Sequence, residues 1–119
     1  MHPKTPKLLE DIRACAAYVL DVTHDLDLSS YLDNYTLRFA VERNFEIIGE
    51  VLNRLSKIDL DTVQRIPDYL QIIAFRNVLI HGYDALNHNR VWQIVQENLP
   101  SLHSQVLALL DEATNSAEQ

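Results

Sequence analysis

The apolar residues of this chain recur mostly at spacings of three and four, which is the period of an α-helix. The clearest stripe contains Leu37, Val41, Phe45, Ile48, Leu52 and Leu55. A second stripe near the N-terminus contains Leu8, Ile12, Cys15 and Val19. No segment alternates apolar and polar residues with the period of two that a half-buried strand requires. The pattern predicts an all-α protein, most simply an antiparallel bundle of four to five helices.

Residues that favour helix ends divide the first half of the chain. Thr5 is expected to cap the first helix, with Pro6 at its first helical position. The stretch "DLDLSSYLD" interrupts the pattern and ends this helix. Either Asp33 or Asn34 can then cap the second helix, because both side chains accept hydrogen bonds from free backbone amides.

The second half divides in the same way. After a linker, "SKIDLDTVQRIPDY", with room for one short turn, Pro67 is expected to open the third helix and Gly82 to end it. Asn87 or Asn89 is expected to cap the fourth. Pro100 breaks or kinks the pattern, which then continues as a further helical stretch.

Length and composition indicate one globular domain over residues 1–119, with the last helical stretch over 101–111 and a frayed tail over 112–119. No apolar run approaches the roughly 20 residues that span a bilayer. The N-terminus lacks the apolar region of a signal peptide, and Cys15 alone cannot form a disulfide framework. These features predict a cytoplasmic protein.

The net charge of −7 argues against a protein that coats nucleic acid nonspecifically, because such binding depends on many Lys and Arg contacts with phosphate. It does not exclude a local basic site. Arg65, Arg76 and Arg90 stand in one segment against Asp68 and Asp84.

The segment "IIAFRNVLIHGYD" combines an apolar helix with the polar residues Arg76, Asn77 and His81. A buried arginine costs several kcal/mol unless it is paired. One interpretation is structural: Arg76 pairs with Glu46 or Glu50, and His81 caps helix carbonyls. The other is functional: the polar notch opens onto a ligand.

Gly49 interrupts the second helix at a cost of about 1 kcal/mol relative to alanine. The simpler explanation is that it lets another helix approach closely.

The order Arg76, Asn77, three apolar residues, His81, one residue and Tyr83 resembles the motif of HEPN domains, specifically of HepT-type toxins. That motif is Arg, four residues of which the first is polar, His, any residue and Tyr. Phe75 departs from it, since a smaller or more flexible residue often precedes the arginine.

The resemblance extends beyond the motif. The segments Arg43–Ser56 and Val91–Leu102 resemble the second-helix and fourth-helix segments of the same family. The similarity covers roughly Leu8 to Leu110, in the right order and with the right gaps.

The resemblance implies a dimeric, metal-independent endoribonuclease, which is the toxin of a toxin–antitoxin pair. RNA brings its own nucleophile, the 2′-hydroxyl. His81 would act as acid or base, because histidine titrates near neutrality, and Arg76 would hold phosphate. Asn77 would orient His81 or donate to the substrate. The partner would be an antitoxin of the minimal nucleotidyltransferase (MNT) fold, which silences the toxin by AMPylation of Tyr83.

Other candidates are weaker. No Cys/His cluster or HExxH sequence indicates a metal site, and no cofactor is expected. His88 and Arg90, at the start of the fourth helix, are candidate contacts with the RNA backbone. The RNA substrate, tRNA or mRNA, is not specified by the sequence. The alternative is a non-catalytic, nucleotide-binding subunit of a minimal nucleotidyltransferase, which the acidic net charge mildly favours.

Overall fold

The computed structural model describes residues 1–82, 84 and 86–118, and the elements within these ranges are all helices. The five long helices are α1 (Thr5–Val22), α3 (Tyr35–Ile58), α5 (Tyr69–His81), α6 (His88–Glu97) and α7 (Leu99–Glu118). Two short helices, α2 (Leu28–Asp33) and α4 (Leu60–Val63), lie in the connections. The predicted all-α class is confirmed. Helix α2 was not predicted, because it lies in the stretch interpreted as a break.

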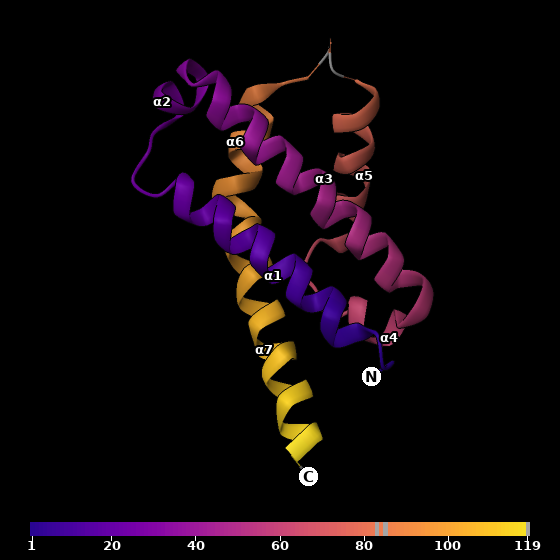
Figure 1. The fold of residues 1–119 in the computed structure, drawn as a ribbon. Coiled ribbons are helices and arrows are strands. Elements are labelled where there is room, and N and C mark those ends of the chain that lie inside the picture. Colours follow the sequence, from indigo (N-terminus) through magenta and orange to yellow (C-terminus); the bar gives the residue numbers. More distant parts are fainter. Residues whose placement is uncertain (83, 85, 119) are drawn as a thin grey trace.

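Helix α3 is the central element. It packs against α1 on one side and α5 on another, and α7 packs against α1 and α6 (Figure 1). Every residue of its predicted stripe is buried: Leu37, Val41, Phe45, Ile48, Leu52 and Leu55. Because α5 follows α3 through the short α4, the C-terminal end of α5 lies at the same end of the bundle as the start of α3 (Figure 1).

Two helix caps settle alternatives that the sequence left open. The Asn34 side chain accepts a hydrogen bond from the backbone amide of Leu37 at 2.9 Å. The Asn87 side chain accepts one from the amide of Arg90 at 3.2 Å. Asn34 and Asn87 are therefore the caps of α3 and α6.

The predicted cap at Thr5 is wrong. Lys4 occupies the N-cap position of α1, without a side-chain cap, and Thr5 is the first helical residue. The Thr5 hydroxyl donates instead to the Asp59 carboxylate at 2.7 Å. A tertiary contact with a residue distant in sequence has replaced the local cap.

Other helix ends shift by a few residues. Helix α5 begins at Tyr69 rather than at Pro67, after Asp68 in the left-handed region with a φ of 61°. Helix α7 begins at Leu99, so Pro100 lies in its first turn, where a proline fits without loss of a hydrogen bond. The helix then continues to Glu118, beyond the predicted end. Among the described residues, no helix has both the length and the apolar character to cross a membrane.

Candidate active site

The candidate site is built where α5 crosses α3 most closely. A Cβ atom added to Gly49 would lie 2.4 Å from the Cβ atom of Arg76, closer than side chains can approach. Gly49 therefore allows Arg76 to lie directly on the backbone of α3, and the expected close approach of another helix is confirmed. The aromatic rings of Phe45 and Phe75 pack edge-to-face one turn away, with centroids 5.6 Å apart.

The guanidinium of Arg76 is held by two neighbours. It lies 2.9 Å from the Glu50 carboxylate, and it donates to the Asn77 side-chain oxygen at 3.1 Å. The structural pairing expected with Glu46 or Glu50 is thus made with Glu50. The other oxygen of Glu50 accepts from Arg54 at 3.1 Å. The buried Nε of Arg76 has no hydrogen-bond partner among the described residues.

His81 is the last residue of α5, and its side chain is exposed. The five-residue separation from Arg76 places the two Cα atoms about 7.5 Å apart along the helix axis and about 140° apart around it. Asn77 contacts Arg76, and among the described residues no hydrogen bond joins Asn77 or Arg76 to His81. Within one chain, Arg76 therefore lies against α3 while His81 points elsewhere.

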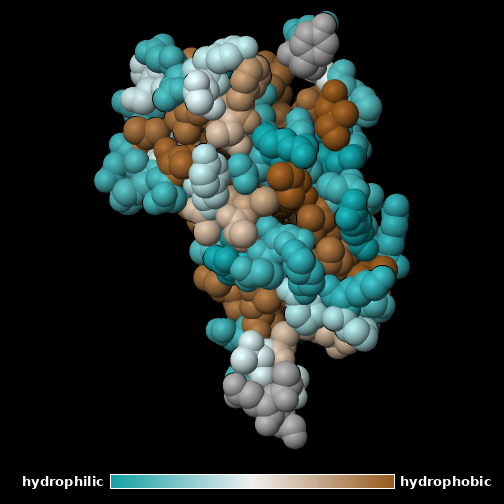
Figure 2. All heavy atoms as spheres, viewed as in Figure 1, coloured by the Kyte–Doolittle hydropathy of each residue, from teal (hydrophilic) through white to brown (hydrophobic). Residues whose placement is uncertain are grey.

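The outward face of α5 is apolar and exposed. The side chains of Leu70, Val78 and Ile80 are 66%, 50% and 40% exposed. Figure 2 shows an apolar patch among hydrophilic side chains near the upper end of this helix. Since α5 packs mainly against α3, the surrounding surface leaves room for another partner.

A polar cluster that the sequence did not predict lies beside the start of α6. Three buried atoms have no hydrogen-bond partner among the described residues: the Tyr31 hydroxyl of α2, one Glu42 carboxylate oxygen of α3 and Nδ1 of His88. Burial raises the pKa values of Tyr31 and Glu42. Burial, together with the charge of Arg38, lowers the pKa of His88. Native proteins seldom leave buried polar atoms unpaired, so this corner is chemically unusual.

The remaining predicted residues lie around the end of α5. His88 and Arg90 are in the first turn of α6, and both side chains are partly buried. The Arg90 guanidinium donates to Gln93 at 2.8 Å. Tyr83, the predicted modification site, lies outside the described residues.

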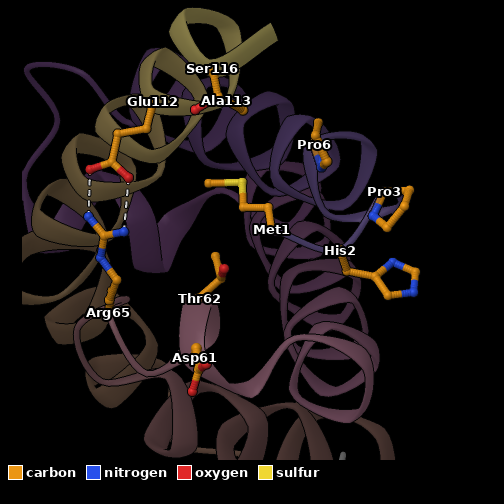
Figure 3. A pocket seen from close by; sticks show the side chains of 10 residues that line it. All are labelled: Met1, His2, Pro3, Pro6, Asp61, Thr62, Arg65, Glu112, Ala113 and Ser116. Carbon is orange, nitrogen blue, oxygen red and sulfur yellow. Dashed lines mark hydrogen bonds and ion pairs between the residues drawn. The ribbon is translucent and has the colours of Figure 1, made fainter.

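A cavity of about 530 Å³ lies at the opposite end of the bundle, between the N-terminus, α4 and α7 (Figure 3). Two of its charged residues pair with each other, since Arg65 contacts Glu112 at 2.9 and 2.5 Å (Figure 3). Among the described residues, no group of three His, Cys, Asp or Glu side chains is arranged to hold a metal ion. The α5 site is therefore the stronger candidate for an active site.

Comparisons with known proteins identify the family. The family model described as "Ribonuclease HepT-like" matches residues 12–109. A "Putative RNase" of Methanocaldococcus jannaschii is 32% identical over 98 residues, which cover 82% of this chain and 89% of that protein. "Probable ribonuclease HepT" of Thermococcus cleftensis is 30% identical over 94 residues, which cover 79% and 84%. No solved structure is significantly similar to the chain.

The fold and the site thus define a helical HEPN-type domain. Because the family match spans most of its length, the chain belongs to the HepT-like ribonuclease family, as its motif predicted.

Proposed function

We propose that this protein is an endoribonuclease whose chemistry is carried by Arg76 and His81. The observation that carries the proposal is that α5 holds both an arginine fixed against α3 and, at its C-terminal end, an exposed imidazole. The named relatives in the ribonuclease family support it. Asn77 acts through Arg76, because its side-chain oxygen accepts from that guanidinium.

The reaction uses a nucleophile that RNA supplies. A base takes the proton of the 2′-hydroxyl, the oxygen attacks the adjacent phosphorus, and the 5′-oxygen leaves with a proton from an acid. The products are a 2′,3′-cyclic phosphate and a 5′-hydroxyl. Arg76 stabilises the negative charge that develops on the phosphoryl oxygens. RNA, imidazole and guanidinium supply every group in this scheme, so cleavage is expected to persist in a metal chelator.

The scheme needs an acid and a base, and each chain supplies one motif histidine. Two copies related by a two-fold axis would bring two His81 side chains into one cleft, because a patch on the axis meets itself. The exposed apolar face of α5 supports such a dimer. Mixing an Arg76→Ala chain with a His81→Ala chain should then restore part of the activity. A fully active monomer in light scattering would refute the composite cleft.

The experiment that tests the ribonuclease itself is His81→Ala. Loss of the proton-transferring group should lower the cleavage rate on the order of 10²- to 10⁴-fold. The matched control is His24→Ala, since His24 is also exposed but lies outside the α5 site. Circular dichroism should show the same fold for both variants. Wild-type cleavage by His81→Ala would overturn the assignment.

The second candidate function is that of a non-catalytic subunit, which holds a nucleotide phosphate at Arg76 for a nucleotidyltransferase. The acidic net charge favours it. Expression without any partner separates the two functions. Growth arrest that disappears in Arg76→Ala supports the nuclease, whereas a harmless wild-type chain supports the subunit.

In the toxin–antitoxin setting implied by the family resemblance, the partner is a minimal nucleotidyltransferase that adds AMP to Tyr83. The added phosphate would occupy Arg76 and exclude RNA. Peptide mass spectrometry after co-expression should place AMP on the peptide that contains Tyr83. Tyr83→Phe should escape silencing by modification, while the exposed control Tyr35→Phe should remain silenced. AMP on another residue would refute this role.

A further inference from the structure

A groove of about 290 Å³ runs between α5 and the beginning of α6. Its floor is formed by Phe75 and Ile94, which are 8% and 1% exposed. The half-exposed Val78 forms part of a wall, and polar side chains of Gln71 and Arg90 stand beside it. An apolar slot with a few polar groups at its edge is the usual form of a small-molecule site.

The groove adjoins the candidate active site along the chain. Val78 precedes His81 by three residues, or about one turn of α5. Asn87 and Arg90 belong to the segment that follows the motif and begins α6. A nucleotide next to one whose phosphate lies at His81 is therefore within reach of the groove.

The electrostatic character of the groove also favours a polyanion. Five of the seven arginines pair with carboxylates: Arg13, Arg43, Arg54, Arg65 and Arg76. Within the described part of the chain, Arg38 and Arg90 have no carboxylate partner. Arg90 contacts the neutral Gln93 instead, and no described residue that lines the groove is acidic. In a protein of net charge −7, the described lining of this groove thus carries a cation and no carboxylate, which favours a phosphate there.

We propose that this groove is a nucleobase subsite, which holds a base adjacent to the scissile phosphate, while Arg90 contacts the phosphate of that nucleotide. The inference rests on the proposed ribonuclease function and extends it to sequence preference. The ring faces would contact Phe75, Val78 and Ile94, because bases stack on apolar side chains. The amides of Gln71 and Asn87 would read the base edge. The Asn87 oxygen already caps α6, so its NH₂ group remains to donate.

The first experiment fills the groove. Ala74 is exposed and lines it, so Ala74→Phe should occupy the slot without disturbing the core. The KM for a short RNA should rise about tenfold or more, the loss of one stacked base, while kcat changes little. Ala14→Phe, at an exposed position of α1, is the matched control and should behave as wild type.

The second experiment reads the base directly. Asn87→Ser keeps a capping hydroxyl but removes the amide, so α6 should persist while the base preference at one position flanking the cleaved bond changes. RNA substrates with each of the four bases at the flanking positions would measure this change. An unchanged KM in Ala74→Phe together with an unchanged base preference in Asn87→Ser would overturn the subsite. If both variants still cleave RNA at the wild-type rate, the ribonuclease assignment is unaffected by that result.

A third measurement does not depend on cleavage. RNA with a photoreactive base is crosslinked to the full-length His81→Ala chain, in which the groove is unaltered. Crosslinks on the peptides that contain Val78 or Arg90, abolished by Ala74→Phe, would support the subsite. Crosslinks confined to other peptides would refute it. Conversion of a dimer to a monomer by Ala74→Phe, with RNA crosslinking unchanged, would show that the groove is instead an interface between two copies.

Discussion

The two ends of the helical bundle treat their polar groups in opposite ways. At the terminal end, defined by Asp59, α4 and the Arg65–Glu112 pair, Asp59, Arg65 and Glu112 all find partners within the chain. The motif end is defined by the end of α5, the start of α6 and the corner between α2 and α3. There, Tyr31, Glu42 and His88 each bury a polar atom that has no hydrogen-bond partner among the described residues.

Asp59 illustrates the terminal end. Its carboxylate accepts from the Thr5 hydroxyl at 2.7 Å, from the His2 amide at 3.1 Å and from the Thr62 amide at 3.2 Å. Burial alone would raise its pKa, but these hydrogen bonds outweigh it and lower the pKa to about 2. Polar groups at the terminal end thus join distant parts of the chain, while several at the motif end have no partner among the described residues. Variants of the first should change stability, and variants of the second should change activity.

The largest effect is expected for Gly49→Ala, where the two roles meet. The added methyl would lie 2.4 Å from the Cβ of Arg76, so α3 and α5 must move apart. Overpacking of this kind costs about 1–3 kcal/mol, partly offset by the better helix propensity of alanine. Misplacing Arg76 should also lower cleavage on the order of 10²-fold. Thermal unfolding would measure the loss of stability, and cleavage assays would measure the loss of activity. Wild-type values in the two assays would show that the close approach of Arg76 to Gly49 is not required.

A smaller effect, on stability alone, is expected for Asp59→Asn. The folded-state pKa of Asp59 lies below the ordinary 3.8, so its stabilising contribution is present above about pH 4 and is lost as the pH falls toward 2. Near pH 6 the free energy of unfolding of the variant should be about 1 kcal/mol lower, because the amide is a weaker acceptor than the carboxylate. The loss stays this small because solvent screens the partly exposed carboxylate. RNA cleavage should be unchanged. The melting temperatures of the wild type and the variant should converge as the pH falls from 6 to 2. A difference that stays constant over this range would contradict a stabilising role of the ionised Asp59 carboxylate.

The smallest effect is expected for Arg65→Gln. Both partners of the Arg65–Glu112 pair are about half exposed, so solvent screens the pair and its contribution to stability is small. The melting temperature should fall slightly, and less in high salt. Arg90→Gln is the matched variant at the motif end, and it should spare the melting temperature while weakening RNA binding. A large loss of stability in Arg90→Gln would remove the distinction between the two ends.

The sequence predicted those parts of the fold that depend on local pattern. The α3 stripe follows from residues within one or two turns of each other, and the caps Asn34 and Asn87 were each one of two neighbouring candidates. Helix α2 was missed because only six residues form it. Its Tyr31 ring is buried against Trp92, a contact between segments far apart in the chain.

The site divides in the same way. The motif predicted Arg76, Asn77 and His81 as site residues, and the structural interpretation offered Glu46 or Glu50 as the partner of Arg76. The groove beside α6 and the orphaned atoms of Glu42 and His88 could not be predicted, because they depend on how α2, α3, α5 and α6 meet. The sequence indicated the groove only through Arg90, which lies in the first turn of the helix that follows the motif.

The double pairing of Glu50 has a consequence for substrate binding. Its two oxygens hold two different cations, Arg54 at 3.1 Å and Arg76 at 2.9 Å. If a phosphate binds Arg76 as proposed, Glu50 would keep its contact with Arg54, so the carboxylate would not be left without a counter-ion. Under that proposal, Arg76 would exchange an internal anion for the substrate at low electrostatic cost. Glu50→Gln would remove the internal competitor, but it would also remove the anion that keeps an empty Arg76 in place.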